Sequence, residues 1–203
     1  MSLPVRLIVM AKAPVPGAVK TRLVPALGEA GAADLAARLL EHAVQQAVAA
    51  GTAAIELCVS PDVAHPWVAQ LCAAHGLQLS AQGEGDLGAR MQRAIDRALG
   101  RGEAACLFGT DAPALDAAML REAAARLATH DAVFVPAFDG GYVLVGLRRE
   151  ASTLFANMPW STARVMALTR ERLVAAGLRW AELPPVHDID EPPDLAHLPP
   201  GWR

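Results

Sequence analysis

Short runs of apolar residues, rich in Val, Ile and Leu, alternate along the chain with longer segments whose apolar residues recur at helical spacing. The short runs predict buried strands, because aliphatic and β-branched side chains fit a pleated sheet. These predicted strands are residues 6–10, 54–59, 77–80, 104–108, 132–137, 142–147 and 178–183. The periodic segments predict helices over 29–50, 66–75, 87–99, 162–176 and, from an N-cap at Asp116, to about residue 129. We expect the proline-rich tail from Pro184 to be irregular.

The order of these elements predicts an α/β fold. Strand and helix alternate from the N-terminus to about residue 130, which implies right-handed crossovers and a mostly parallel sheet with helices on both faces. The strands at 132–137 and 142–147 flank an Asp-Gly-Gly turn that favours an antiparallel hairpin. No change of composition and no internal repeat marks a second domain, so we expect residues 1–203 to form a single domain.

Composition and charge exclude several classes of protein. Apolar residues make up 53% of the chain and aromatic residues only 4%, so aliphatic side chains must form the core. The net charge is −3, with 18 basic residues scattered among 21 acidic ones. We expect no nucleic-acid partner, because binding a phosphate backbone needs clustered Lys and Arg. The N-terminal apolar run of about six residues is too short for a signal peptide or a membrane span. The three cysteines lack CxxC spacing, which favours buried, reduced thiols in the cytoplasm: Cys58, Cys72 and Cys106.

The loop after the first predicted strand, AKAPVPGAVKTRL (residues 11–23), carries a candidate phosphate site. Ligands of open α/β sheets bind beyond the carboxyl ends of the strands, so this loop is well placed. It contains three cations, Lys12, Lys20 and Arg22, and also Gly17, which allows a close approach of the backbone. Ammonium and guanidinium groups together suit a diphosphate or triphosphate, although the spacing is not that of a P-loop. The alternative is a loop whose cations only face water.

Asp111 follows the apolar strand 104–108 in the segment FGTDAPAL. A carboxylate next to apolar surroundings must be hydrogen-bonded, paired or bound to a metal. Aspartate oxygens suit Mg²⁺ or Mn²⁺, which bind one or two carboxylates together with substrate phosphates. The alternative is that Asp111 caps the following turn.

Two further segments carry carboxylates at candidate positions. In PAFDGGYVLVGL, Asp139 precedes two glycines that leave space beside it, and Tyr142 adds a ring and a hydroxyl; a simple hairpin turn explains this sequence equally well. In HDIDEPPDL, Asp188 and Asp190 are two apart and would share one face of an extended segment, with His187 as a further candidate ligand or proton carrier. An exposed acidic tail is the alternative there.

No sequence pattern of a protein nucleophile is present. The chain lacks a Ser-His-Asp or Cys-His order, a zinc-ligand spacing and a GxSxG elbow. Phosphate-binding cations and carboxylates instead favour transfer chemistry, in which a divalent ion neutralises a leaving diphosphate while the acceptor attacks directly.

Six segments resemble a known family in the same order: AKAPVPGAVKTRL, QGEGDLGARM, FGTDAPAL, PAFDGGYVLVGL, MPWSTARV and HDIDEPPDL. They are similar to DUF2064, a bacterial family regarded as glycosyltransferase-like and placed in the GT-A nucleotide-diphospho-sugar transferase superfamily. The resemblance covers roughly residues 5–195 and extends to small guanylyltransferases of the 2-phospho-lactate and molybdenum-cofactor types. It implies a Rossmann-like three-layer sandwich with a mostly parallel, mixed sheet.

The resemblance also implies roles for individual residues. Those facing the nucleotide and its phosphates would be Lys12, Gly17, Lys20, Arg22, Gln82 and Arg90. The catalytic residues would be Asp111 and Asp139, with Asp111, Asp188 and Asp190 as ligands of Mg²⁺ or Mn²⁺. The acceptor or sugar site would be formed by Gly140, Gly141, Tyr142, Trp160 and Ser161. Two departures stand out: the segment Thr110-Asp111-Ala112 lacks the Asp-x-Asp pair of many glycosyltransferases, and the glycine-rich first loop of the molybdenum-cofactor type is absent.

Other charged residues have a simpler interpretation. Arg90, Arg93 and Arg97 share one helix face; Arg90 lies nearest the loop and is the candidate for ligand contact or for pairing with Asp86, whereas the other two favour a solvated, salt-bridged face. Five histidines are expected at the surface: His42, His65, His75, His130 and His197.

Three functions remain open, and the sequence favours the first, which is transfer of a sugar from a nucleotide-diphosphate donor to a small-molecule acceptor. The main alternative is nucleotidyl transfer that releases pyrophosphate. The third is a nucleotide-binding module without turnover, which the missing Asp-x-Asp leaves open.

Overall fold

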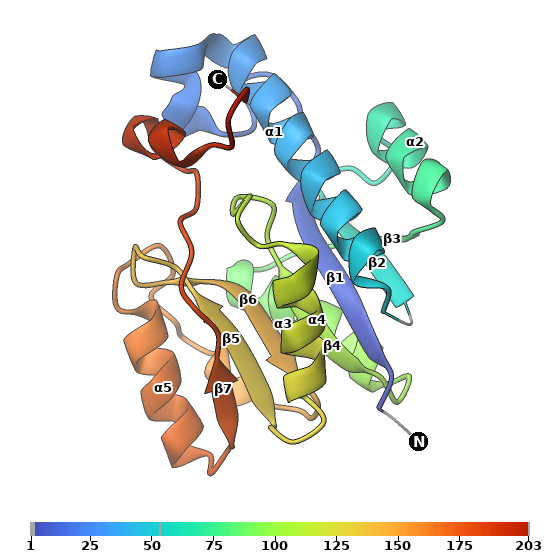
Figure 1. Cartoon of the computed structure of the whole chain (residues 1–203), viewed down its shortest axis with the longest axis vertical. Coiled ribbons are helices and arrows are strands. Elements are labelled where there is room, and N and C mark those ends of the chain that lie inside the picture. Colours follow the sequence, from blue (N-terminus) through green and yellow to red (C-terminus); the bar gives the residue numbers. More distant parts are fainter. Residues whose placement is uncertain (1–2, 53, 203) are drawn as a thin grey trace.

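The computed structural model describes residues 3–52 and 54–202, which form one seven-stranded sheet between two layers of helices (Figure 1). The strands follow the order β3-β2-β1-β4-β6-β5-β7 across the sheet. Their bounds are β1 Val5–Lys12, β2 Ala54–Ser60, β3 Gln78–Ala81, β4 Ala104–Phe108, β5 Ala132–Pro136, β6 Tyr142–Leu147 and β7 Trp180–Glu182. The predicted α/β class is confirmed, with all seven strands close to their expected positions.

The sheet is parallel except for one strand. β1 pairs in parallel with β2 and β4, β2 with β3, and β5 with β7. β6 is antiparallel to both of its neighbours, β4 and β5, so the predicted hairpin is present. The mixed sheet therefore places the carboxyl ends of β1, β2, β4 and β5 at one edge.

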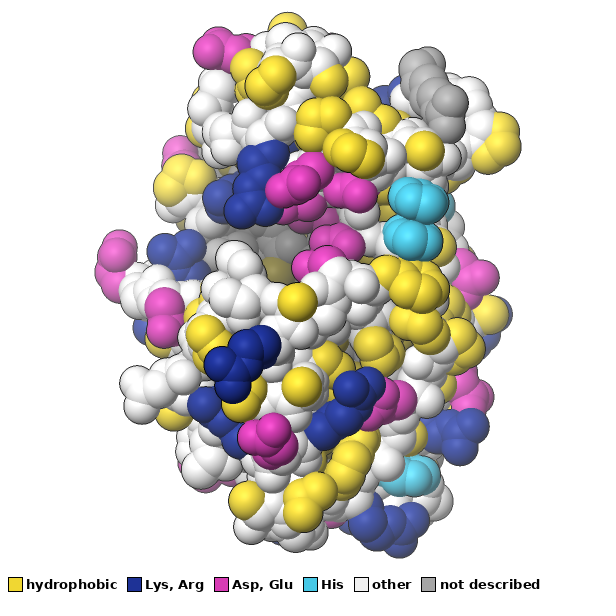
Figure 2. Space-filling model, turned by 90° about the vertical axis from the view of Figure 1, so that its left-hand side faces the viewer, with side chains coloured by type: hydrophobic (Ala, Val, Ile, Leu, Met, Phe, Trp, Pro, Cys, Tyr) yellow, Lys and Arg dark blue, Asp and Glu magenta, His cyan; other side chains and the backbone are white. Residues whose placement is uncertain are grey.

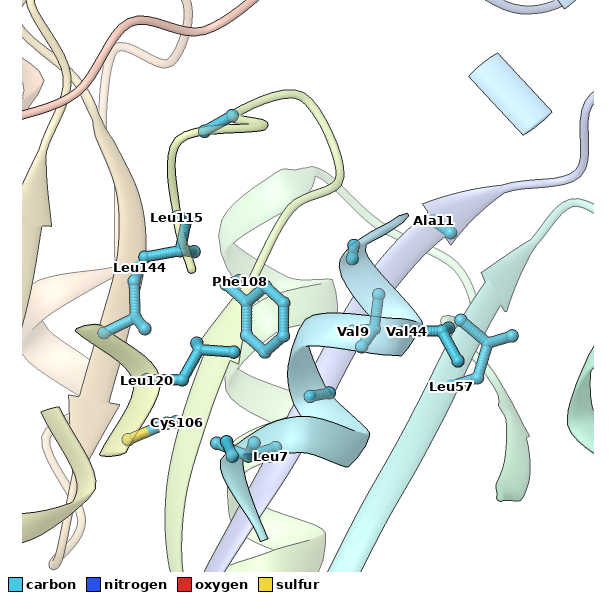
Figure 3. Packing of buried hydrophobic residues seen from close by; sticks show 14 of the residues in the cluster. Leu7, Val9, Ala11, Val44, Leu57, Cys106, Phe108, Leu115, Leu120 and Leu144 are labelled. Carbon is cyan, nitrogen blue, oxygen red and sulfur yellow. The ribbon is translucent and has the colours of Figure 1, made fainter. Parts of the chain in front are cut away.

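The two faces of the sheet bury separate apolar clusters, because side chains alternate along each strand. Leu7 and Val9 of β1 belong to the cluster beneath α1, α2 and α4, which Figure 3 shows together with Phe108. Ile8 and Met10 belong to the cluster beneath α3 and α5 on the opposite face.

Two helices, α2 and α3, begin and end at the predicted residues. The bounds of the helices are α1 Val24–Ala50, α2 Pro66–His75, α3 Leu87–Leu99, α4 Ala117–Arg126 and α5 Val165–Ala175. Asp116 accepts a hydrogen bond from the backbone N–H of Met119 as the N-cap of α4, as expected. α1 is interrupted at Gly28, whose φ of 70° and ψ of 168° are not helical, so its regular part starts at the predicted Glu29.

Several expected boundaries were wrong. α4 ends at Arg126 rather than near residue 129, and α5 starts at Val165 rather than at residue 162. The loop expected over residues 11–25 contains the end of β1 and a 3₁₀ helix, η1 (Thr21–Leu23). A second 3₁₀ helix, η2 (Ser152–Leu154), follows β6. The tail is not wholly irregular, since η3 (Pro192–His197) forms a third one, and its flanking apolar residues pack against α1 (Figure 1).

All three cysteines are buried and free, as predicted, and burial raises the pKa of Cys106 to about 12. Across residues 3–52 and 54–202 there is no helix whose length and apolar character would let it cross a membrane.

Candidate functional site

A cleft of about 930 Å³ opens at the carboxyl ends of β1 and β4. Its walls come from the loop between β1 and α1, the start of α3, the β5–β6 hairpin and the C-terminal segment at residues 188–191. Figure 2 shows one side of the molecule on which Lys and Arg side chains lie beside Asp and Glu side chains at the edge of a hollow. The cleft is where the rule for open α/β sheets places a ligand.

Lys20 and Asp111 form an ion pair within the cleft. The Lys20 Nζ lies 2.7 Å from Asp111 Oδ1 and also donates a hydrogen bond to the carbonyl oxygen of Ile189. The Lys20 side chain is only 6% exposed, whereas that of Asp111 is 46% exposed. Lys20 has a left-handed backbone with φ of 47°, which is uncommon outside glycine and often marks functional sites.

A second and more exposed pair lines the same cleft. The Arg22 guanidinium donates to Asp190 Oδ2, and Glu191 is 3.9 Å from the same guanidinium. All three side chains are exposed enough for water to screen them. Two of the predicted phosphate-binding cations, Lys20 and Arg22, are thus paired with two of the predicted metal-binding acids, Asp111 and Asp190.

Asp188 differs from these paired acids. Its partial burial, followed by the nearby carboxylates of Asp139 and Asp111, raises its pKa. Asp139 itself accepts a hydrogen bond from the backbone N–H of Gly141 at 2.8 Å, which orients its carboxylate at the turn of the hairpin. The cleft therefore contains a group of three carboxylates whose charges are incompletely offset.

The predicted nucleotide-contacting residues occupy different positions. Lys12, Gln82 and Arg90 line the cleft together with Lys20 and Arg22. The Gln82 amide is buried and donates to the carbonyl oxygens of Ala11 and Cys58, so it fixes the ends of β1 and β2.

Gly17 lies outside the cleft lining, and a Cβ at this position would meet the Glu29 carboxylate at 3.4 Å. Arg90 donates to the carbonyl oxygen of Gly85 at 2.9 Å rather than to Asp86, which instead caps α3 through the N–H of Ala89.

The solvated, salt-bridged face expected for Arg93 and Arg97 is present only in part. Arg97 forms an ion pair, but on the buried side, because it donates to the Glu56 carboxylate, whose side chain is 2% exposed. Arg93 is exposed, but it holds the loop before α3 by donating to the carbonyl oxygens of Gln82 and Glu84. Of the five histidines expected at the surface, only His197 is exposed; the other four are partly buried.

The predicted acceptor residues divide into two groups. Tyr142 and Ser161 line the cleft, and Ser161 has a φ of 62°. Trp160 instead packs behind it, edge-on to Tyr142 and close to Gly88 of α3.

Gly140 and Gly141 shape the hairpin rather than the cleft wall. A Cβ on Gly140 would lie 2.3 Å from the carbonyl oxygen of Ala163, and the Gly140 carbonyl accepts from the N–H of Met166 at 2.8 Å. Gly140 therefore permits the close approach between the hairpin and the segment before α5.

Two contributors to the site had no individual prediction. The backbone of Ile189 donates to the Asp111 carbonyl oxygen at 2.8 Å while its own carbonyl accepts from Lys20. Thr110 donates to Asp111 Oδ1 at 3.1 Å. Thr110 could have been found from its place beside Asp111, but a backbone contact such as that of Ile189 leaves no residue-type signal.

The donor set fits a magnesium-like ion only when a phosphate ligand shares it. Among residues 3–52 and 54–202, no three His, Cys, Asp or Glu side chains are arranged to hold a metal by themselves. Mg²⁺ commonly takes one or two carboxylates and completes its shell with phosphates and water. Asp111 and Asp188 fit this mode, because both line the cleft and the carboxylate of Asp111 helps to raise the pKa of Asp188.

Comparisons with solved structures agree with the fold. A protein from Desulfovibrio desulfuricans, provisionally assigned as a nucleotide-diphospho-sugar transferase, is 31% identical with a TM-score of 0.84, covering 92% of this chain and 82% of its own. A nucleotidyl transferase from Methanothermobacter shares the fold at 13% identity and a TM-score of 0.62, with 96% and 95% covered.

A third structure, glucosyl-3-phosphoglycerate synthase from Mycobacterium tuberculosis in complex with Mn²⁺, uridine diphosphate and glucosyl-3-phosphoglycerate, has 9% identity and a TM-score of 0.57, with 96% and 75% covered. A search among functionally curated proteins gave no match. Residues 29–162 match the family described as "Uncharacterized protein conserved in bacteria (DUF2064)". The chain therefore belongs to the DUF2064 family, and its fold is that of the nucleotide-diphospho-sugar transferases.

Proposed function

We propose that the protein is a nucleotide-dependent transferase of the cytoplasm that moves a sugar from a nucleotide-diphosphate donor to a small-molecule acceptor, with Mg²⁺ or Mn²⁺ as cofactor. The observation that carries the proposal is the meeting of Lys20 and Arg22 with Asp111 and Asp188 in one cleft at the carboxyl edge of the sheet. Its similarity to transferases of both the glycosyl and nucleotidyl type supports the general reaction.

In this proposal the residues of the cleft have separate binding roles. Lys12, Lys20 and Arg22 bind the donor's phosphates, and Gln82 and Arg90 lie on the nucleotide side of the cleft. Asp111 and Asp188 would hold the divalent ion, and the ion would offset the negative charge of the leaving diphosphate. Asp190 is a weaker candidate ligand, because Arg22 already engages it.

The acceptor would bind on the opposite side, beside Tyr142 and Ser161, while Gly140 and Gly141 fix the hairpin that carries Asp139. Gly141 holds one oxygen of the Asp139 carboxylate. The other oxygen would accept the proton of the acceptor hydroxyl as the hydroxyl oxygen attacks the sugar carbon of the donor. The bond between that carbon and the diphosphate breaks in the same step, and the nucleoside diphosphate leaves.

A thermal-shift screen tests this proposal. The probes are nucleoside diphosphates, nucleoside triphosphates and nucleotide-sugars, each with and without Mn²⁺. A ligand present at 100 times its dissociation constant should stabilise the protein by about 2.7 kcal/mol. The Asp111→Asn variant should lose the Mn²⁺-dependent part of the shift. The matched control is Asp116→Asn. Asp116 lies outside the cleft lining, and asparagine is also a good N-cap residue, so α4 should be kept.

The proposal fails if none of these ligands raises the melting temperature, or if Asp111→Asn keeps the full Mn²⁺-dependent shift. Product analysis then separates the two transfer reactions. Release of a nucleoside diphosphate supports sugar transfer, whereas release of pyrophosphate from a triphosphate supports nucleotidyl transfer. Binding without either product would identify a nucleotide-binding module.

A further inference from the structure

Lys20 is an unusual candidate phosphate ligand, because its side chain is almost completely withdrawn from water. Its side chain is 6% exposed, and its partners are the Asp111 carboxylate and the Ile189 carbonyl oxygen. A buried ammonium without a counter-charge is strongly unfavourable. The Lys20 backbone is fixed as well, since its carbonyl accepts the N–H of the fully buried Leu23 at 2.8 Å.

The backbone and one carboxylate oxygen of Asp111 are held by neighbouring residues, but its side chain remains accessible from the cleft. Its backbone carbonyl accepts from Ile189, and both Lys20 and Thr110 bind the same carboxylate oxygen, Oδ1. Because nearly half of the Asp111 side chain is exposed, a ligand in the cleft can reach the carboxylate without moving the backbone.

We propose that Lys20 is an internal counter-ion of Asp111, so that a phosphate-bearing ligand and a divalent cation bind by exchanging partners with this pair and thereby favour each other's binding. This inference rests on the proposed function only in taking phosphate and a divalent cation as the two ligands. It assigns to the Lys20–Asp111 pair a role in coupling the binding of the two ligands.

The coupling follows from charge compensation. A phosphate that takes Lys20 alone leaves Asp111 unpaired beside Asp188. A cation that takes Asp111 alone leaves the buried Lys20 ammonium with only a carbonyl partner. When both ligands bind, each of the two charges regains an opposite partner, so each ligand lowers the free energy of binding the other. The Arg22–Asp190 pair can exchange in the same way, but its exposure makes the effect smaller.

The first experiment measures Mn²⁺ bound to the protein by equilibrium dialysis, with and without inorganic pyrophosphate. A protein-free titration gives the amount of the Mn²⁺–pyrophosphate complex, for which the binding constants are corrected. In the wild type, pyrophosphate should tighten Mn²⁺ binding by about five- to tenfold. Lys20→Met removes the competitor of the cation. This variant should bind Mn²⁺ about fivefold more tightly than the wild type without pyrophosphate, and pyrophosphate should add little.

Arg101→Met is the control, because Arg101 lies outside the cleft lining and donates to the side chain of Gln78. It removes one positive charge and leaves the Lys20–Asp111 pair in place. It should retain the enhancement by pyrophosphate, and it should change Mn²⁺ affinity less than Lys20→Met does.

The second experiment is reciprocal and uses metal-free pyrophosphate in calorimetry. Asp111→Asn frees Lys20, so it should bind pyrophosphate several-fold more tightly than the wild type, while Mn²⁺ should no longer tighten that binding. Circular dichroism spectra establish that the variants are folded. This arm tests the exchange even if Lys20→Met fails to fold.

Several results would overturn the inference: no Mn²⁺ binding at the cleft in any variant, equal Mn²⁺ affinity in the wild type and Lys20→Met, or equal changes in Arg101→Met and Lys20→Met. An unchanged pyrophosphate affinity in Asp111→Asn would also overturn it. Coupled binding of Mn²⁺ and pyrophosphate without any nucleotide binding would support the exchange and remove the transfer proposal. Nucleotide binding without coupling between Mn²⁺ and pyrophosphate would overturn the exchange and leave the transfer proposal standing.

Discussion

Two charged regions lie at opposite edges of the sheet, and they shift the pKa values of their carboxyl groups in opposite directions. Asp131 precedes β5 at the amino edge and accepts hydrogen bonds from the Arg179 backbone N–H and from the guanidinium groups of Arg148 and Arg149. Burial by itself would raise the pKa of Asp131, but these hydrogen bonds outweigh it and lower the pKa to about 2. Asp188 lies at the carboxyl edge, where partial burial and neighbouring carboxylates raise its pKa.

The difference distinguishes a satisfied ion-pair network from the acids of the candidate site. Three residues donate four hydrogen bonds to Asp131, so its carboxylate is satisfied and has little to gain from a further ligand. In the cleft, burial and the neighbouring carboxylates destabilise the charged form of Asp188. A bound cation would offset this repulsion. Perturbed carboxylates of this kind are typical of functional sites, whereas satisfied ion pairs are typical of structural ones.

The largest expected effect concerns the backbone that supports the cleft edge. Gly140→Ala should destabilise the protein by about 3 kcal/mol or more, because φ is 91° and the new Cβ would meet the Ala163 carbonyl oxygen. Urea unfolding measures the change. The control is Gly102→Ala at the opposite edge, where φ is 76° but no atom lies within 4 Å, and there we expect only about 1 kcal/mol. Equal losses in the two variants would show that the close approach at Gly140 is unimportant.

The Asp131 region should respond to loss of its charge. Asp131→Asn should cost about 1–2 kcal/mol at pH 7, because the three donating residues lose a charged acceptor. The folded pKa of about 2 is below the ordinary 3.8, so the stabilisation is complete above pH 3.8 and is lost as the pH falls toward 2. Unfolding experiments across this range should show the two proteins converging in acid.

Glu122→Gln is the control for that variant. Glu122 pairs with Arg126 on the exposed face of α4, with both side chains 48% exposed, and its loss should cost less than about 0.5 kcal/mol. A constant difference between wild type and Asp131→Asn from pH 7 to pH 2 would contradict the assignment of Asp131.

The smallest expected effect has the opposite sign. Asp188→Asn removes one carboxylate from the group formed with Asp139 and Asp111, so the unliganded protein should become slightly more stable at pH 7, by about 0.5 kcal/mol. A rise in melting temperature would show it. Asp190→Asn should give no such gain, because Arg22 already offsets that charge. A lower melting temperature for Asp188→Asn would place it with Asp131 as a structural acid.

Much of the fold was predictable because the signals are local. Pro66–His75 and Leu87–Leu99 begin and end at the predicted residues, since each has its own apolar periodicity and a glycine beyond its last turn. The position of Asp111 at the end of a buried strand also followed from the apolar run before it. The true environment of Arg97 did not, because Glu56 lies 41 residues away and pairs with it only through the packing of α3 on β2.

The sequence by itself determined the alternation of strands and helices, the α/β class and the edge of the sheet at which the charged loops gather. These properties follow from periodicity, capping and chain order, each of which is visible within a few residues. Only the tertiary structure decided that Lys20 is buried against Asp111, that Arg22 meets Asp190 and that Asp188 remains among other acids. Partner choice between distant charges depends on burial and direction, and these exist only once the C-terminal segment has folded back over the first loop.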